Sequence, residues 1–256
     1  MKKIIFFIII LTSLKNFSQE KIISQLEIQY IIHYNTEIPN TKEGTLYIDN
    51  KFNKSLFIYG KNKKRKIEEN RDNNNFKIQF AGSIRFNYVN FKSDSIYSKE
   101  KVFNEEFIIA ENIKDFNWNL EDESKKIDNL LVKKATLNFR GRNYIAWYTE
   151  KYSVKFGPWK FQNLPGLIIE IYDETKRYHW IATSFSNKEN VINFSKMKKD
   201  LKKISLKKFV EKRYNKNLSL FNNSKLPRGT IINKRKIKRN GIETKFEWEE
   251  EKTKKD

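Results

Sequence analysis

The stretch from Gly157 to Asp173 constrains the fold of this 256-residue chain more than any other part of the sequence. Two of the chain's four Pro residues lie in it. Pro158 ends any strand that precedes it, because Pro fixes φ and has no backbone donor. The segment Leu164-Pro165-Gly166-Leu167 predicts a type II turn, in which Gly166 takes the positive φ of the second central position. The apolar run that follows the turn predicts a buried strand, so the stretch marks the folded centre of the protein.

The same stretch carries a family resemblance. Residues 157–168 read Gly-Pro-Trp-Lys-Phe-Gln-Asn-Leu-Pro-Gly-Leu-Ile, which resembles the G-P-W/Y-K-F-x-G-L-P-G-L-I signature of the GLPGLI family. That family comprises secreted or envelope proteins of Gram-negative bacteria without an assigned biochemical role. This chain departs from the signature at Asn163, where a Gly is usual. We expect the bend to be retained, because Asn tolerates the left-handed backbone best among the other residues.

Further blocks upstream extend the resemblance over roughly residues 116–185. They are Lys133 to Thr136, Phe139 to Arg142 and Ala146 to Glu150. Leu131-Val132 stands where the family pattern leads us to expect a polar-Cys pair, so any role of that thiol is absent here.

The N-terminus has the pattern of a secretory signal peptide. Met1-Lys2-Lys3 is basic, Ile4 to Leu11 is an unbroken apolar run too short to span a bilayer, and Ser18 is a small residue near the expected cleavage point after Ser18 or Gln19. The alternative interpretation is an N-terminal strand or a membrane anchor. We therefore expect a leader over residues 1–19, a β domain over 20–215 and a basic, partly flexible extension over 216–256. Export would place the protein in the periplasm or at the outer-membrane periphery, or else outside the cell.

Most of the remaining sequence predicts β-structure. Apolar residues alternate over Leu26 to Tyr34, over Phe76 to Phe80 and over Ile84 to Tyr88, and residues 167–185 predict a hairpin. We count ten to twelve strands, including one over 242–248, with a solvated loop over 61–75. One C-terminal helix is expected from Ser205 onward, with Leu206, Phe209 and Val210 at helical spacing. The predicted fold is mainly β: a single antiparallel, strongly curved sheet or open barrel with this helix.

The charge of the chain has two interpretations. Formal net charge is +21, and from Lys196 to the end there are 21 Lys and Arg against 8 Asp and Glu. Such a basic region would favour an anionic partner such as nucleic acid, surface glycans or the lipid headgroups of a membrane surface. The alternative, which we favour, is a compositional bias toward Lys, Asn, Ile, Phe and Tyr that carries no function.

The residues typical of catalysis are almost absent from the sequence. The chain has no Cys and two His, and it contains neither a nucleophile elbow nor a Gly-rich phosphate loop. Glu170 and Asp173 could form a carboxylate pair, but a spacing of three along a strand puts them on opposite faces. We therefore predict no catalytic residue, no cofactor and no metal site.

Arg and aromatic residues around the signature form the best candidate for a contact surface, since both types anchor interfaces and stack on ligands. The alternative is that the Trp residues fill the core and the Arg pair solvates a turn. The candidate binding or motif residues are Arg140, Arg142, Trp147, Tyr148, Gly157, Pro158, Trp159, Pro165 and Gly166, with Tyr144 beside them.

Two classes of function remain open. The first is a non-enzymatic exported envelope protein that binds an apolar or peptide-like ligand, or docks onto an outer-membrane partner. The second is a hydrolase whose carboxylate site the sequence does not reveal. Nucleic-acid binding is the least favoured, because export removes the protein from those targets.

Overall fold

The computed structural model describes residues 20–51, 53–60, 65–69, 76–80, 84–102, 104–112, 116–215 and 239–249. The expected leader lies outside these residues, as do 216–238 and 250–256 of the expected extension. Within the described part of the chain, no helix is both long enough and apolar enough to cross a membrane.

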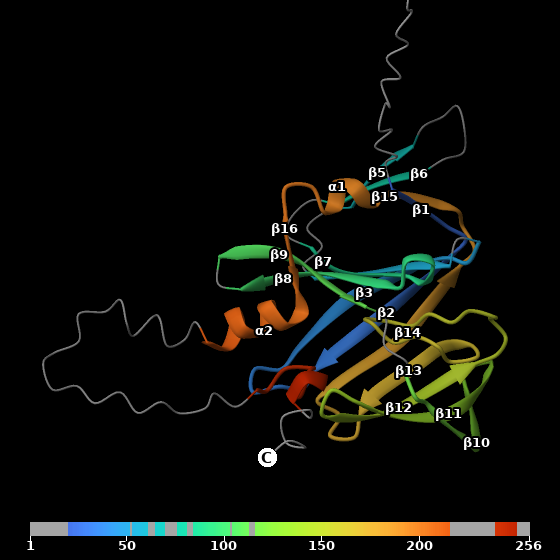
Figure 1. Cartoon of the computed structure of the whole chain (residues 1–256). Coiled ribbons are helices and arrows are strands. Elements are labelled where there is room, and N and C mark those ends of the chain that lie inside the picture. Colours follow the sequence, from blue (N-terminus) through green and yellow to red (C-terminus); the bar gives the residue numbers. More distant parts are fainter. Residues whose placement is uncertain are drawn as a thin grey trace, which may run out of the picture.

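Twelve strands form one large sheet, in the spatial order β10-β11-β12-β13-β14-β2-β3-β4-β7-β8-β9-β16 (Figure 1). In that order the strands are β10 (Asn119–Ile127), β11 (Leu130–Phe139), β12 (Arg142–Thr149), β13 (Leu167–Asp173), β14 (Tyr178–Ser186), β2 (Leu26–Tyr34), β3 (Asn40–Asp49), β4 (Lys54–Tyr59), β7 (Arg85–Asn90), β8 (Ser95–Val102), β9 (Glu105–Asn112) and β16 (Lys202–Ser205).

A second sheet has four strands in the order β1 (Lys21–Ser24), β15 (Asn190–Asn193), β6 (Phe76–Phe80) and β5 (Arg65–Glu69). It lies over the part of the large sheet that contains β3, β4 and β7 (Figure 1). The named helices of the described residues are the 3-10 helix η1 (Phe91–Ser93) and the α-helices α1 (Phe194–Met197) and α2 (Leu206–Asn215), and residues 247–249 add one helical turn.

The fold is mainly β, as the sequence predicts, but the prediction of one antiparallel sheet is wrong. The large sheet is mixed, because β16 pairs parallel to β9, and it does not close into a barrel. Parallel pairing needs a long crossover connection, and residues 113–201 separate these two strands in the sequence. Local alternation carries no information about such a distant partner, so a chain of hairpins was the natural expectation.

The second sheet exists because the central strands are apolar on both faces. In β4 the run from Ser55 to Tyr59 is buried without alternation, so each face needs its own cover. One face joins the main core with Phe57 and Tyr59. The other face carries Leu56 and packs against the small-sheet layer; its apolar cluster contains Ile22, Tyr47, Leu56, Ile58, Ile84, Phe86, Tyr88, Ile108, Ile192 and Phe194.

Several local predictions can be compared directly with the structure. The hairpin over 167–185 is confirmed by the antiparallel pairing of β13 with β14. The expected helix is confirmed as α2, and Ser205 caps it by accepting from the Lys208 backbone N–H at 3.3 Å. The prediction of a solvated loop over 61–75 is wrong in part, because β5 lies within that range. The expected strand over 242–248 is also wrong.

The signature turn keeps its bend by a different backbone conformation from the one predicted. Asn163 has φ of 69°, so the expectation for the departing residue is confirmed, whereas Gly166 does not adopt positive φ. Gly166 is needed for space: a Cβ atom there would lie 2.3 Å from the carbonyl oxygen of Thr149. The type II assignment at Gly166 is therefore wrong, because the close approach of the end of β12 excludes a side chain.

Candidate functional site

A row of polar and aromatic side chains crosses one face of the large sheet. Strand register brings it together: Tyr178 is opposite Tyr34 across β14 and β2, and Arg85 is opposite Tyr59 across β7 and β4. Lys42 on β3 and Glu100 on β8 extend the row. Farther along the same strands this face carries main-core residues, so the row lies where the apolar core ends.

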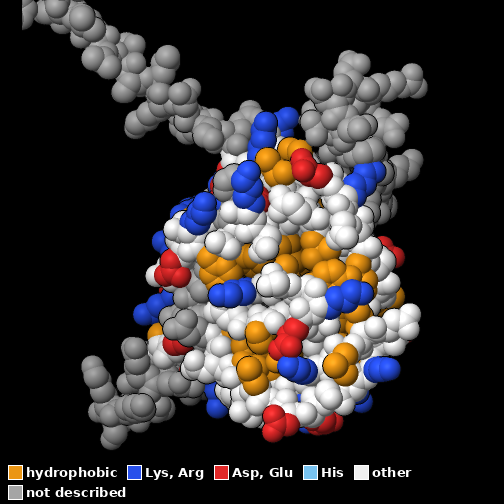
Figure 2. All heavy atoms as spheres, turned by 90° about the vertical axis from the view of Figure 1, so that its right-hand side faces the viewer, with side chains coloured by type: hydrophobic (Ala, Val, Ile, Leu, Met, Phe, Trp, Pro, Cys, Tyr) orange, Lys and Arg blue, Asp and Glu red, His pale blue; other side chains and the backbone are white. Residues whose placement is uncertain are grey.

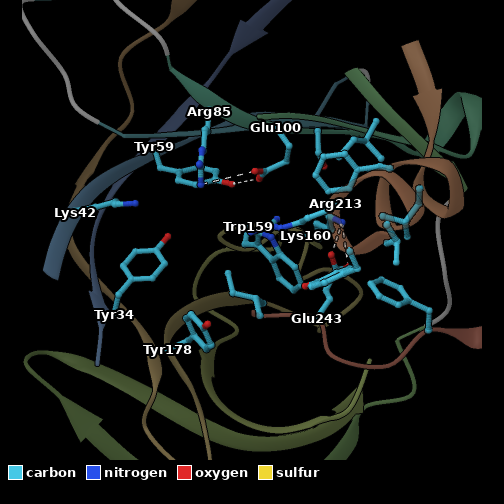
Figure 3. A pocket seen from close by; sticks show the side chains of 18 residues that line it. Tyr34, Lys42, Tyr59, Arg85, Glu100, Trp159, Lys160, Tyr178, Arg213 and Glu243 are labelled. Atoms are coloured by element: carbon cyan, nitrogen blue, oxygen red, sulfur yellow. Dashed lines mark hydrogen bonds and ion pairs between the residues drawn. The ribbon is translucent and has the colours of Figure 1, made fainter. Parts of the chain in front are cut away.

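This row forms one wall of a cavity of about 260 Å³. A second wall comes from α2, and a third from the signature loop together with residues 242–246. Figure 3 shows the side chains of Tyr34, Lys42, Arg85 and Tyr178 directed toward the central space, with Trp159 across from Tyr34. The lining residues are Tyr34, Lys42, Tyr59, Arg85, Ser98, Glu100, Ile109, Trp159, Lys160, Tyr178, Leu206, Phe209, Val210, Arg213, Tyr214, Ile242, Glu243 and Phe246.

The signature positions two cavity residues through a tight loop. Gly157 donates its backbone N–H to the Phe161 carbonyl at 2.9 Å, and Phe161 donates to the Pro158 carbonyl at 3.1 Å. Trp159 lies between them with φ of 55°, an uncommon backbone conformation for a bulky residue. The loop buries both Trp159 and Lys160. A Cβ atom on Gly157 would approach Cδ1 of Ile168 to 2.6 Å, so any larger residue there would force the Ile168 side chain to shift.

A buried network of charges lies under this loop. The Lys160 Nζ atom contacts the carboxylates of Glu111 and Glu243, the latter at 3.2 Å. Arg140 contacts both of the same carboxylates, Glu111 at 2.8 Å, and Glu247 at 3.1 Å. The side chains of Arg140, Lys160 and Glu111 are only 3–6% exposed.

The network sets the protonation of its members. Burial alone would lower the pKa of Lys160, but Glu111 and Glu243 outweigh burial and raise the pKa. Burial would likewise raise the pKa of Glu243, but Lys160 and Arg140 outweigh it and lower the pKa. Lys160 and Glu243 therefore stay ionised at neutral pH. They build the wall of the cavity and are not free acids or bases.

Arg142 attaches the C-terminal segment, defined here as residues 239–249, to the turn between β11 and β12. Its guanidinium donates to the carbonyl oxygen of Gly241 at 2.8 Å and pairs with Asp173 at 3.0 Å. The backbone N–H groups of Thr244 and Lys245 both donate to the Arg140 carbonyl, at 2.9 and 3.2 Å. These bonds replace a strand ladder, which is why the segment does not form the predicted strand.

The candidate contact residues from the sequence therefore separate into different places. Trp159 lines the cavity, whereas Arg140 and Arg142 contact the chain's own C-terminal segment. Tyr148 is buried in the main core, and Pro165 lies exposed in the signature turn. Trp147 is buried in the same core cluster, and its ring centre lies 4.0 Å from the Nζ atom of Lys125.

The two carboxylates flagged in the sequence face opposite sides, as predicted. Glu170 bonds Nε2 of His179 at 2.9 Å on the outer face, and this contact lowers the pKa of Glu170. Asp173 is buried on the inner face and pairs with Arg142. Among the described residues, no group of three or more His, Cys, Asp or Glu side chains could hold a metal ion.

The face of the molecule opposite α2 exposes hydrophobic side chains. Figure 2 shows hydrophobic side chains gathered in a band across the middle of that face, with Lys and Arg side chains dispersed around it.

Sequence reasoning missed the cavity residues on β2, β3, β4, β7 and β8. Their convergence depends on the register of five strands, which no local pattern reveals. Lys160 carried a weak signal, because it lies directly between Trp159 and Phe161. A charged residue in such a setting indicates a buried ion pair.

Comparison with known proteins shows a likeness in fold. No family model and no curated protein matches the chain. Among solved structures it is similar to PNGF-II in two crystal forms, C2 and P21, with TM-scores of 0.52 and 0.51 and 17% identity in both. The likeness covers 74–75% of this chain but 32–33% of PNGF-II, so the chain spans about one third of that protein.

Proposed function

We propose that this protein is a non-enzymatic exported envelope protein that holds a small ligand with an apolar or peptide-like body in the cavity. The observation that carries the proposal is the composition of the cavity. Aromatic side chains from three separate elements, Tyr34, Tyr178 and Trp159, converge on a space of about 260 Å³. Concave sites with aromatic walls and a few convergent polar groups are typical of small-ligand sites.

The cavity is also held in shape before any ligand arrives. The Lys160 network fixes the signature loop against the C-terminal segment, and both carry lining residues. The left-handed backbone of Trp159 also supports a preformed cavity. A strained conformation persists only where the surrounding packing holds it, and such positions often mark ligand sites. A rigid wall lowers the entropy lost on binding.

The chemistry of the carboxylates favours binding over hydrolysis. Glu243 is tied to Lys160 and Arg140, and Glu100 accepts a hydrogen bond from the Tyr59 hydroxyl at 3.0 Å. A general acid needs a raised pKa near the working pH, whereas the pKa of Glu243 is lowered. Turnover of a glycoside or ester substrate that disappears in a Glu100→Gln variant would instead establish the hydrolase.

Membership of the GLPGLI family and export to the envelope are part of the proposal. The left-handed backbone of Asn163 supports the resemblance, since the departing residue keeps the conformation that Gly would adopt. The basic start and apolar run of the N-terminus support export. A membrane-embedded or other envelope partner is compatible with the same location.

Titration with the small neutral fluorophore 1-naphthylamine tests the binding function. We expect saturable binding at one site, seen as a rise in probe fluorescence. Ile242→Trp should abolish it, because Ile242 lines the cavity and the larger side chain fills it. Ile38→Trp is the matched control, since Ile38 is 80% exposed and the variant should bind normally.

A second variant, Tyr34→Ala, enlarges the cavity and should weaken binding without filling it. Circular dichroism of each variant separates loss of binding from loss of fold. If wild type does not bind the probe, or if Ile242→Trp binds as wild type does while folded, the proposed site is wrong.

A further inference from the structure

The cavity carries more positive than negative charge. Four cationic side chains line it, Lys42, Arg85, Lys160 and Arg213, against the carboxylates of Glu100 and Glu243. Lys160 and Glu243 neutralise each other within the buried network. Of the charge that remains unbalanced, Arg213 contributes one unit from α2, and the sheet row contributes the other, since Lys42 and Arg85 face one carboxylate there, Glu100.

Lys42 is partly buried and has no carboxylate partner among the described residues. Its Nζ atom lies 4.5 Å from the centre of the Tyr34 ring, and Figure 3 shows it directed into the cavity. Burial and the nearby charge of Arg85 lower the pKa of Lys42 and outweigh the opposing effect of Glu100. A cation kept in such a place costs folding free energy, so an arrangement that retains it suggests a role other than stability.

Arg85 shares its nearest carboxylate, that of Glu100, with the hydroxyl of Tyr59. Its Nη1 atom is 3.7 Å from Oε2 of Glu100, beyond hydrogen-bond distance, while Oε1 of Glu100 accepts from Tyr59 at 3.0 Å. The Arg85 side chain is 45% exposed. The guanidinium therefore keeps donors available at the edge of the cavity, on the same wall as Lys42.

We propose that Lys42 and Arg85 form an anion subsite, so that the ligand is a compact amphipathic carboxylate whose apolar body lies against Tyr34, Tyr178 and Trp159. The inference rests on the proposed binding function and names the chemical class of the ligand. A carboxylate between the two cations would relieve their mutual repulsion and accept charge-assisted hydrogen bonds from both. Arg85 offers the planar fork that matches a carboxylate.

The size of the cavity limits the rest of the ligand. Drug-sized ligands occupy pockets of roughly 300–1,000 Å³, so this space suits a body of about a dozen non-hydrogen atoms. The rings of Tyr34 and Tyr178 have their centroids 5.8 Å apart, and together with the Trp159 indole they offer flat apolar surfaces. A bicyclic aromatic acid satisfies both limits.

Calorimetric titration with 2-naphthoate and with its neutral isostere 2-naphthamide tests the subsite. We expect wild type to bind the acid roughly 10- to 100-fold more tightly than the amide, the range given by charge-assisted hydrogen bonds. Lys42→Met should remove that preference by weakening binding of the acid far more than binding of the amide, and Lys42→Arg should retain it. Increasing salt should weaken binding of the acid and not of the amide.

Lys133→Met is the control, because Lys133 lies on β11 outside the cavity and pairs with the exposed Glu150. This variant should bind both probes as wild type does. Lys42→Met should fold with an unchanged or higher melting temperature, since it removes a poorly solvated cation. Equal affinities of wild type for acid and amide would overturn the anion subsite alone. Absence of binding by both probes and by the neutral fluorophore would overturn the binding function too.

Discussion

Arg140 and Glu243 form a buried ion pair although 103 residues separate them in the sequence. Arg140 lies in the turn between β11 and β12, and Glu243 belongs to the C-terminal segment. The pair is joined by Lys160 of the signature, so the turn, the signature and the C-terminal segment share one network. The C-terminal segment is therefore part of the folded centre, even though its sequence is polar.

Replacing Arg140 should destabilise the protein strongly. Arg140→Ala leaves Glu111 and Glu243 with Lys160 as their remaining buried cation, and breaking a buried pair in this way costs about 3–5 kcal/mol. Urea denaturation at neutral pH measures the change in the free energy of unfolding. Lys133→Ala is the comparison, because its partner Glu150 is solvent-exposed and the change should be small. Similar effects of the two variants would contradict a buried network.

The stability of the protein should fall in acid. The pKa of Glu243 in the folded protein is below the ordinary value of 4.5, because Lys160 and Arg140 outweigh burial. A lowered folded pKa contributes stability above the unfolded pKa, and that contribution is lost as pH falls from about 4.5 through the folded pKa. Glu20 and Glu170 have lowered pKa values and add to the same slope.

Glu243→Gln isolates the share of that residue. The variant should be less stable than wild type at pH 7, and the difference in unfolding free energy should shrink as pH falls below 4.5. Denaturation curves at pH 7, 5, 4 and 3 provide the comparison. A difference that stays constant across this range would show that Glu243 does not titrate as a partner of the two cations.

Two substitutions in the signature turn should have opposite outcomes. Gly166→Ala places a Cβ atom 2.3 Å from the Thr149 carbonyl oxygen, and the forced backbone shift should cost about 1–3 kcal/mol. Asn163→Gly should be tolerated, because φ of 69° suits Gly. Thermal melting of both variants is the measurement. A Gly166→Ala protein that melts with wild type would mean that the end of β12 does not approach the turn so closely.

Removal of the region beyond Asn215 should destabilise the fold more than it affects lipid binding. The truncation deletes Glu243 and the bonds to Arg140 and Arg142, so we expect a lower melting temperature. If the Lys and Arg residues of that region reflect composition, flotation with anionic vesicles at physiological salt should be weak for the full chain as well. Tight flotation of the full chain that survives physiological salt would make the region a membrane-surface anchor.

Export should be visible in the mass of the native protein. Because the N-terminus has the pattern of a signal peptide, the mature chain should begin near Gln19 or Glu20. Mass spectrometry of the envelope and extracellular fractions locates the new N-terminus. An intact chain starting at Met1 in those fractions would contradict processing.

The sequence by itself determined the elements that depend on near neighbours. Alternation over Leu26 to Tyr34 is enough to form a half-buried strand, and Ser205 followed by Leu206, Phe209 and Val210 is enough to cap and orient α2, because both patterns act within a few residues. Asn163 could be assigned to left-handed backbone for the same reason, since that preference belongs to the residue itself.

Only the tertiary structure decided the cavity and the charge network. Lys42, Arg85 and Glu100 come together through the register of separate strands, and β16 pairs parallel to a strand from the preceding half of the chain. Glu243 is ionised in the interior only because Lys160 and Arg140 reach it from distant segments. Burial and charge pairing are properties of the packed chain, and their energies depend on neighbours that a linear pattern does not specify.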